Sequence, residues 1–453
     1  MTSMALSTPG SSVAMGTSEP LLPDRDPFYR TEEPLGGIEP GTILRSRAVR
    51  LGLFGLVPQR ISAWQLLYRS TDLNGRPEAA VTTVLMPWGA DPAAPRPLVS
   101  FQCAIDAVAP MCFPSYALRH GARALGSIPQ LELLLIAGAL ARGWAVSVPD
   151  HEGLGGHFGA AREPGYRALD AARAALRFPA LGLRAETPIG LWGYSGGGLA
   201  TAWAAELAAE YAPELDIIGA VAGSPVGDPA NAFVRLNGSP FAGFAMVFTA
   251  GLARAYPQLE PILRDHLSEE FRALLKRAEH TATFPLLARF AGRDADRHTR
   301  AGLVAMLAEP ELHTVLDEIR PGAQAPAMPM LILQAVNDEV IAVADIDAHV
   351  SRYLDRGAHI HYLRDRLSMH LPLQFLGAPA MIDWLADRFD EVPLDSPGVQ
   401  TIWSVALSAR ARTQHLGFAA LLVRMLTGRA IRVRHQRRPQ IPQPRRLRGI
   451  ETG

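Results

Sequence analysis

Ser195 lies between the apolar run 188–194 and the alanine-rich run 199–211, inside the glycine-rich string GYSGGG. A serine at a tight strand-to-helix turn presents its hydroxyl at the edge of a sheet, where it can attack a carbonyl carbon. Small neighbours are needed there because strand and helix approach closely. The alternative, a phosphate-binding loop of the Walker type, needs a Gly-Lys-Ser/Thr string that the sequence lacks. The predicted nucleophile elbow comprises Gly193, Tyr194, Ser195, Gly196 and Gly197.

A serine nucleophile of this kind needs a histidine base and a carboxylate that orients the base. In proteins with this elbow the chain order is serine, acid, histidine, with the acid in the turn after a late strand. Asp338 follows the apolar run 328–336 and fits that place, with Glu339 as its main rival. His370 is predicted as the base because it lies in a loop past the β-rich run 358–365. The other downstream histidines are His349, His359 and His361.

The surrounding sequence alternates between strand-like and helix-like segments. Two β-rich runs at 62–72 and 79–87 are separated by NGRPE, which predicts an antiparallel hairpin. Short, nearly continuous apolar runs are typical of strands buried on both faces; they occupy 97–105, 144–150, 188–194, 216–223 and 328–336. Helical segments between them occupy 128–143, 166–178 and 199–211. This alternation predicts an α/β fold with a mostly parallel sheet, helices on both faces, and the hairpin at its antiparallel edge.

The alternation stops between residues 225 and 322, where mixed polar and apolar helical segments predict an inserted helical cap. It resumes with the run at 328, the run 358–365 and a last helix at 378–389. The predicted divisions are a disordered leader (1–24), a first core part (25–224), the cap (225–322), a second core part (323–392) and an Arg-rich C-terminal tail (393–453).

The composition of the 453 residues, 48% hydrophobic with zero formal net charge, predicts a globular protein with a sizeable core. No run of eighteen apolar residues occurs, and the N-terminus lacks a secretory signal pattern. A cytoplasmic or peripheral membrane location is therefore favoured. The two cysteines, Cys103 and Cys112, exclude a disulfide framework but leave one bridge between them open. No metal or organic cofactor is expected, because no Cys/His cluster has metal-ligand spacing.

The C-terminal end is strongly basic, since residues 401–453 contain eleven Arg and a single acid, Glu451. Within it, LGFAALLVRML at 416–426 is an apolar window flanked by arginines. Residues 401–438 therefore predict either a helix lying on an anionic membrane surface or a helix docked on the core with a disordered basic end. No nucleic-acid recognition motif occurs, so no nucleic-acid partner is expected. The oligomeric state is not indicated.

Several strings between residues 25 and 390 resemble the secretory lipase family, of lipase A type, in the α/β-hydrolase superfamily. They are DPFYR, PGTILRSR, AWQLLYRSTD, SFQCAIDAVAPMCFPSY, VPDHEG, GYSGGGLATAWAAELA and the end from Asp338 to His370. The resemblance implies an α/β-hydrolase core with a helical cap, and Ser195, Asp338 and His370 as the catalytic triad. It also implies an oxyanion hole from the backbone of Asp106 and Gly196. Secretion is suggested by this resemblance alone.

The function expected from the triad and the resemblance is hydrolysis of carboxylic esters through an acyl-enzyme on Ser195, with acylglycerols or other lipid esters as substrates. Two alternatives are an acyltransferase that uses the same triad, and a non-catalytic lipid- or membrane-binding protein that keeps the fold. Asp150 and Glu152, in the string PDHEG, are interpreted as structural.

Overall fold

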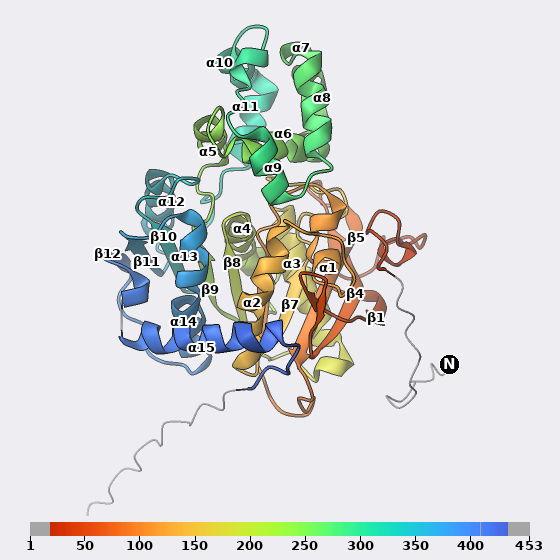
Figure 1. The fold of residues 1–453 in the computed structure, drawn as a ribbon, viewed down its shortest axis with the longest axis vertical. Helices are drawn as coiled ribbons and strands as arrows, with labels where there is room; N and C mark the ends of the chain where they lie inside the picture. The colour runs from red at the N-terminus through yellow and green to blue at the C-terminus, as the bar shows by residue number, and fades with distance from the viewer. Residues whose placement is uncertain (1–18, 408, 434–453) are drawn as a thin grey trace, which may run out of the picture.

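A computed structural model describes residues 19–407 and 409–433, which form an α/β core with a helical cap (Figure 1). One mixed sheet of ten strands runs through the core. Its strands, in spatial order, are β1 (Ile43–Ala48), β4 (Ile61–Thr71), β5 (Pro77–Pro87), β7 (Ala145–Pro149), β6 (Leu98–Gln102), β8 (Ile189–Tyr194), β9 (Ile217–Gly223), β10 (Met330–Ala335), β11 (Ile360–Asp365) and β12 (Gly398–Ile402). The strands from β7 to β12 are parallel, and β1, β4 and β5 extend the sheet antiparallel.

Helices cover both faces of this sheet, as the strand and helix pattern predicts. One face carries α3 (Glu163–Arg177), α4 (Gly196–Tyr211) and α12 (Val343–Asp355). The other carries α2 (Ile128–Ala141), α13 (His370–Leu376) and α14 (Ala378–Phe389), and α15 (Ala409–Leu426) packs on the outside of α2 and α14. Successive side chains of β8 point to opposite faces of the sheet. Leu191 therefore packs in the hydrophobic core on the α3 and α4 side, and Trp192 packs in the core on the α2 and α14 side. The predicted α/β-hydrolase fold is confirmed.

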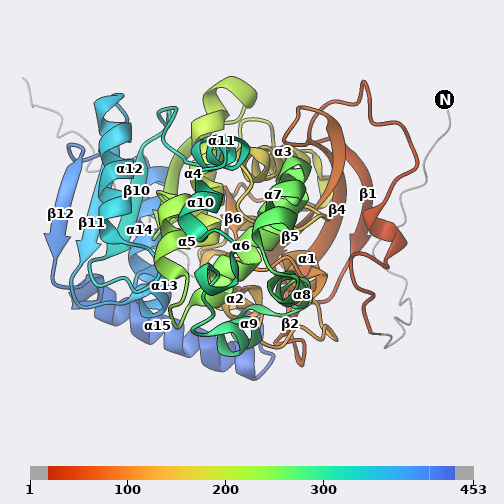
Figure 2. The same ribbon diagram turned by 90° about the horizontal axis from the view of Figure 1, so that it is seen from above.

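The helical cap lies between β9 and β10 and sits over the end of the sheet where the parallel strands terminate (Figures 1 and 2). Its helices are α5 (Pro229–Leu236), α6 (Ala242–Ala255), α7 (Glu260–His266), α8 (Glu269–Ala278), α9 (Thr283–Phe290), α10 (Leu303–Leu307) and α11 (Pro310–Glu318). All fall within the interval 225–322. The division of the chain into domains at the predicted bounds stays a prediction.

Both edges of the sheet differ from the prediction. The hairpin β4–β5 is not the edge, because β1 pairs outside β4. At the other edge, β12 lies in the interval predicted as tail and pairs with β11. Both edge strands are largely exposed or half-exposed, so their residues lack the apolar pattern that marks a buried strand.

The predicted leader differs as well. Residues 1–18 lie outside the described residues, but residues 19–24 pack on the core, because Pro20 and Pro23 are buried and Glu19 pairs with Arg123 at 2.8 Å. The two cysteines are buried and free, so the bridge left open by the sequence is absent. In the part of the chain that the structure describes, no helix is long and apolar enough to cross a membrane.

Candidate active site

Ser195 stands at the turn between β8 and α4 with φ 55° and ψ −122°, a conformation that non-glycine residues rarely adopt. The glycines around it are required by close backbone contacts. A Cβ on Gly193 would lie 2.1 Å from the carbonyl oxygen of Gly197, and one on Gly197 would lie 2.1 Å from the carbonyl oxygen of Gln102. The turn therefore holds the serine at the carboxyl end of the sheet, beneath the cap.

The structure brings the three predicted side chains together, although they come from distant parts of the chain. The Ser195 Oγ is 2.9 Å from Nε2 of His370, and Nδ1 of the same ring is 2.8 Å from Oδ2 of Asp338. All three residues are buried. This arrangement can remove a proton from the hydroxyl and stabilise the imidazolium that results.

Asp338 is held by the loop after β10. Its Oδ1 accepts the backbone N–H groups of Val340 and Ile341 at 2.9 and 2.7 Å, and its Oδ2 accepts Nε2 of Gln334 at 3.0 Å. Burial raises the pKa of this carboxyl, but the charge of His370 and these hydrogen bonds outweigh it and lower the pKa below its ordinary value. Asp338 is therefore ionised at neutral pH.

His370 was predicted in a loop, but it is the first residue of α13. The position is fixed by backbone contacts, since its N–H donates to Glu339 at 2.8 Å and its carbonyl oxygen accepts the Tyr194 hydroxyl at 2.6 Å. Burial lowers the pKa of the imidazole, whereas the charge and hydrogen bond of Asp338 raise it, and the net shift is upward.

The rival residues lie elsewhere. Glu339 accepts the backbone N–H of His370, and its carboxyl is not bonded to the imidazole. His359 and His361 contact each other through their Nε2 atoms at 2.9 Å. His349 is buried in α12 against Tyr353, with ring centroids 4.3 Å apart. These histidine contacts all lie away from Ser195.

Asp106 and Gly196, the predicted oxyanion residues, lie beside the serine. Asp106 has φ 45°, and a Cβ on Gly196 would lie 2.1 Å from its Oδ1. Among the hydrogen bonds of the described residues, neither backbone N–H has an acceptor within the protein. Two unused donors near a nucleophile can stabilise a developing oxyanion.

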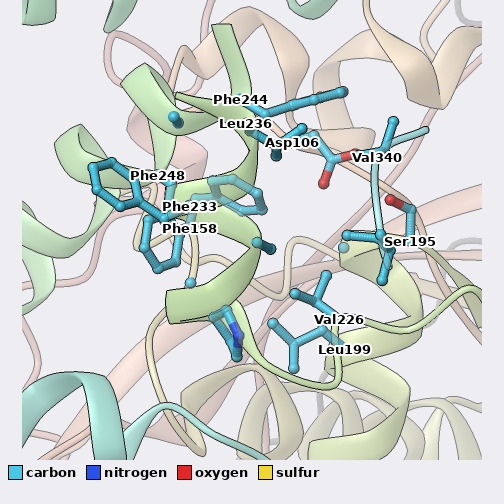
Figure 3. A pocket seen from close by; sticks show the side chains of 16 residues that line it. Asp106, Phe158, Ser195, Leu199, Val226, Phe233, Leu236, Phe244, Phe248 and Val340 are labelled. Atoms are coloured by element: carbon cyan, nitrogen blue, oxygen red, sulfur yellow. The ribbon is translucent and has the colours of Figure 1, made fainter. Parts of the chain in front are cut away.

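The Asp106 carboxyl points into the same cavity as the Ser195 hydroxyl (Figure 3). Burial raises the pKa of this carboxyl to about 7, against the opposing effect of His370. The side chain is therefore neutral well below pH 7 and anionic well above it.

Three polar residues near the site were missed by the sequence analysis. Gln334 bonds Asp338, as described above. Glu132 accepts the backbone N–H of Ala104 at 3.0 Å and Nε2 of Gln374 at 2.8 Å, so it links the oxyanion segment to α13. Glu132 and Gln334 each stand alone in an apolar run, and a lone polar residue there is the signal that indicates a buried partner.

The interpretation of Asp150 as structural fits its contacts, because its Oδ1 accepts the backbone N–H of Ser115 at 2.8 Å and its Oδ2 accepts the Ser115 hydroxyl. Glu152 is buried nearby. The described residues contain no group of three or more His, Cys, Asp or Glu that could hold a metal ion.

A small apolar cavity of about 50 Å³ lies between Ser195 and the cap helices α5 and α6. This volume is well below the ~300 Å³ at the lower end of ordinary ligand pockets, so a long substrate requires these helices or their side chains to move. Its aromatic lining residues are Phe158, Phe233, Phe244 and Phe248 (Figure 3).

The chain is similar in sequence and in structure to known proteins of one family. A family model described as secretory lipase matches residues 118–396. The chain is 48% identical to a Mycobacterium tuberculosis protein named a probable inactive lipase, over 91% of this chain and 92% of that protein. It is 37% identical to lipase A of Arthroderma benhamiae, over 83% of this chain and 81% of that protein.

Among solved structures, the X-ray structure of Candida antarctica lipase A superposes with a TM-score of 0.78 and 27% sequence identity, covering 89% of this chain and 95% of that one. The similarity extends over the core and the cap together, because the coverage exceeds the core alone.

Proposed function

The chain belongs to the secretory lipase family, and on this premise we propose that it hydrolyses lipid esters through an acyl-enzyme on Ser195. The observation that carries the proposal is the hydrogen-bonded series from Ser195 through His370 to Asp338, at 2.9 and 2.8 Å. A relative named a probable inactive lipase raises the question of activity. The complete series in this chain favours catalysis, since a protein that only binds lipid has no use for it.

The reaction proceeds in two halves on these residues. His370 Nε2 takes the proton of Ser195 as Oγ attacks the ester carbonyl carbon, and the N–H groups of Asp106 and Gly196 stabilise the resulting oxyanion. The tetrahedral intermediate collapses when His370 gives the proton to the leaving alcohol oxygen. Water then attacks the acyl-enzyme by the same steps and releases the fatty acid. Membership of a secretory family supports a secreted protein as part of this proposal.

The proposal is tested by p-nitrophenyl ester hydrolysis and by labelling with a fluorophosphonate probe. We expect hydrolysis that saturates with substrate, and stoichiometric labelling that stops it. Added alcohol separates hydrolysis from acyl transfer, because a transferase would form mostly a new ester and little free acid. A protein that neither labels nor turns over any acyl-chain length would be a non-catalytic lipid binder, and the proposal would then be abandoned.

A bell-shaped pH profile is expected for kcat/KM. The rate rises with pH through the raised pKa of His370, because only the neutral imidazole can accept the serine proton. It then falls above a pH of about 7, because the Asp106 carboxyl loses its proton and its negative charge opposes the oxyanion. The fall should approach about tenfold per pH unit if the anionic form is inactive.

Asp106→Asn should remove the alkaline decline and move the acidic limb to lower pH, because asparagine has a similar shape but lacks the negative charge that helps raise the pKa of His370. A profile measured from pH 5 to 10 on both proteins checks this. The explanation would be wrong if the variant declined at the same alkaline pH as the wild type.

The acyl-chain preference should depend on Phe233, which, like Phe248, lines both the catalytic cavity and a second apolar cavity inside the cap. Phe233→Ala joins the two and lets about two more methylenes be buried, each worth about 0.8 kcal/mol. The ratio of kcat/KM for a C16 ester over a C4 ester should therefore rise about tenfold. Phe271→Ala is the matched control, since Phe271 is buried in the cap and lines neither cavity. Equal ratios in the two variants would refute this role.

A further inference from the structure

Helix α15 has two apolar faces, and only one of them is covered. Ala411, Leu421 and Met425 are buried on the side that packs against α2 and α14. This packing fits a helix docked on the core, one of the two arrangements that the sequence left open. The opposite side is exposed and apolar from residue 416 to 426. Its residues are Leu416, Ala419, Ala420, Leu422, Val423 and Leu426.

The exposed apolar face is unusual for a surface helix, whose outward side is normally charged or polar. Leu416, Val423 and Leu426 are 73%, 59% and 52% exposed. A contiguous exposed apolar surface is typical of a contact site for another molecule. The exposed face of α15 is therefore expected to contact an apolar partner.

Positively charged residues flank the exposed apolar face, and they indicate what kind of partner it would bind. Arg412 before it and Arg429 and Arg432 after it are exposed, and Arg424 donates to the carbonyl oxygen of Ala430. The sequence contains no Asp or Glu between residues 396 and 450. The partner is therefore apolar where it meets the helix and negatively charged at both ends of it. A bilayer with anionic headgroups has both properties.

We propose that the outer face of α15 attaches the protein to an anionic lipid bilayer. The helix lies in the interface with Leu416, Val423 and Leu426 among the acyl chains, while the flanking arginines bind headgroup phosphates. A second copy of the chain fits less well, because two apposed α15 helices would bring arginines together with no acid to pair them.

The position of α15 relative to the cap determines how the attached protein would lie on the membrane. The cap lies at one end of the long axis of the molecule, and α15 lies near the other (Figure 1). Binding through α15 therefore places the membrane contact away from the end of the molecule that the cap occupies. This goes beyond the proposed function, since attachment needs no catalysis and catalysis on a soluble ester needs no attachment.

The test uses the full chain with Ser195→Ala, so that lipid esters are not consumed, and co-sedimentation with phosphatidylcholine vesicles with or without phosphatidylglycerol. We expect binding to the mixed vesicles that weakens with salt, and about fivefold loss for each of Arg412→Gln and Arg429→Gln. Val423→Asp should weaken binding at least about tenfold. Val304→Asp is the matched control, because Val304 lies in the cap and is 83% exposed.

Three outcomes would overturn the proposal. Equal binding to both vesicle types would remove the role of the arginines. Loss of binding in the Val304 variant alone would make the cap the contact surface. Dimers that Val423→Asp dissociates, without vesicle binding by either form, would identify a second copy as the partner. Thermal melting checks that each variant is folded. In the chain that keeps Ser195, the Val423→Asp substitution should leave hydrolysis of a soluble ester unchanged. Failure of attachment is thus distinguishable from failure of catalysis.

Discussion

Ser195→Ala is expected to lower kcat for ester hydrolysis by about 10⁴- to 10⁶-fold, which corresponds to roughly 5.5 to 8 kcal/mol of transition-state stabilisation. The alanine cannot form the acyl-enzyme, and no other hydroxyl is bonded to His370 Nε2 among the described residues. KM should change little, because the hydroxyl contributes little to the apolar cavity that we propose as the acyl-chain site. Steady-state hydrolysis of a p-nitrophenyl ester measures both parameters.

The matched control is Ser127→Ala, since Ser127 is also buried and its hydroxyl has no hydrogen-bond partner in the described structure. It should keep wild-type activity and fluorophosphonate labelling, whereas Ser195→Ala should lose both. If hydrolysis persisted in Ser195→Ala while labelling disappeared, the activity would come from another group, and the acyl-enzyme on Ser195 would have to be given up.

The fold was predictable from sequence because its buried strands and helices have strong local patterns. The run 188–194 is apolar on both sides, and the alanines of 199–211 let α4 pack closely on the sheet. The edge strands β1 and β12 escaped prediction, because an exposed edge carries no apolar pattern and is recognised only through its neighbour.

Only part of the candidate site could be predicted from the sequence. Residues fixed by local backbone contacts were predictable, whereas contacts between residues far apart in the chain were not. Ser195 is marked by the glycines beside it, which follow from backbone contacts within a few residues. Asp338 and His370 were chosen by their order after known strands, so their positions were expected but not their contacts. The link through Glu132 joins residues more than two hundred positions apart, and no local pattern specifies it.

Asp338→Asn should lower kcat about 10⁴-fold, and Glu339→Gln by less than about tenfold, which separates the two adjacent acids. Asparagine can donate its amide hydrogen to Nδ1 of His370, which places the ring proton on Nε2 and leaves no base for Ser195. Glutamine at 339 still offers an oxygen to the backbone N–H of His370. Pre-steady-state and steady-state ester hydrolysis by the two variants would give the comparison.

The pH dependence makes the assignment sharper. The negative charge of Asp338 raises the pKa of His370, so its removal should move the acidic limb of the residual activity to lower pH. Glu339 also contributes to the raised pKa, as a smaller cause than Asp338, so Glu339→Gln should move the limb less in the same direction. If Glu339→Gln caused the larger loss of rate and the larger shift of the acidic limb, Glu339 would be the carboxylate that orients His370, and Asp338 would have the lesser role. Because the two residues are neighbours with the same charge, the difference between the variants depends on which carboxyl the imidazole contacts, and that contact is 2.8 Å to Asp338.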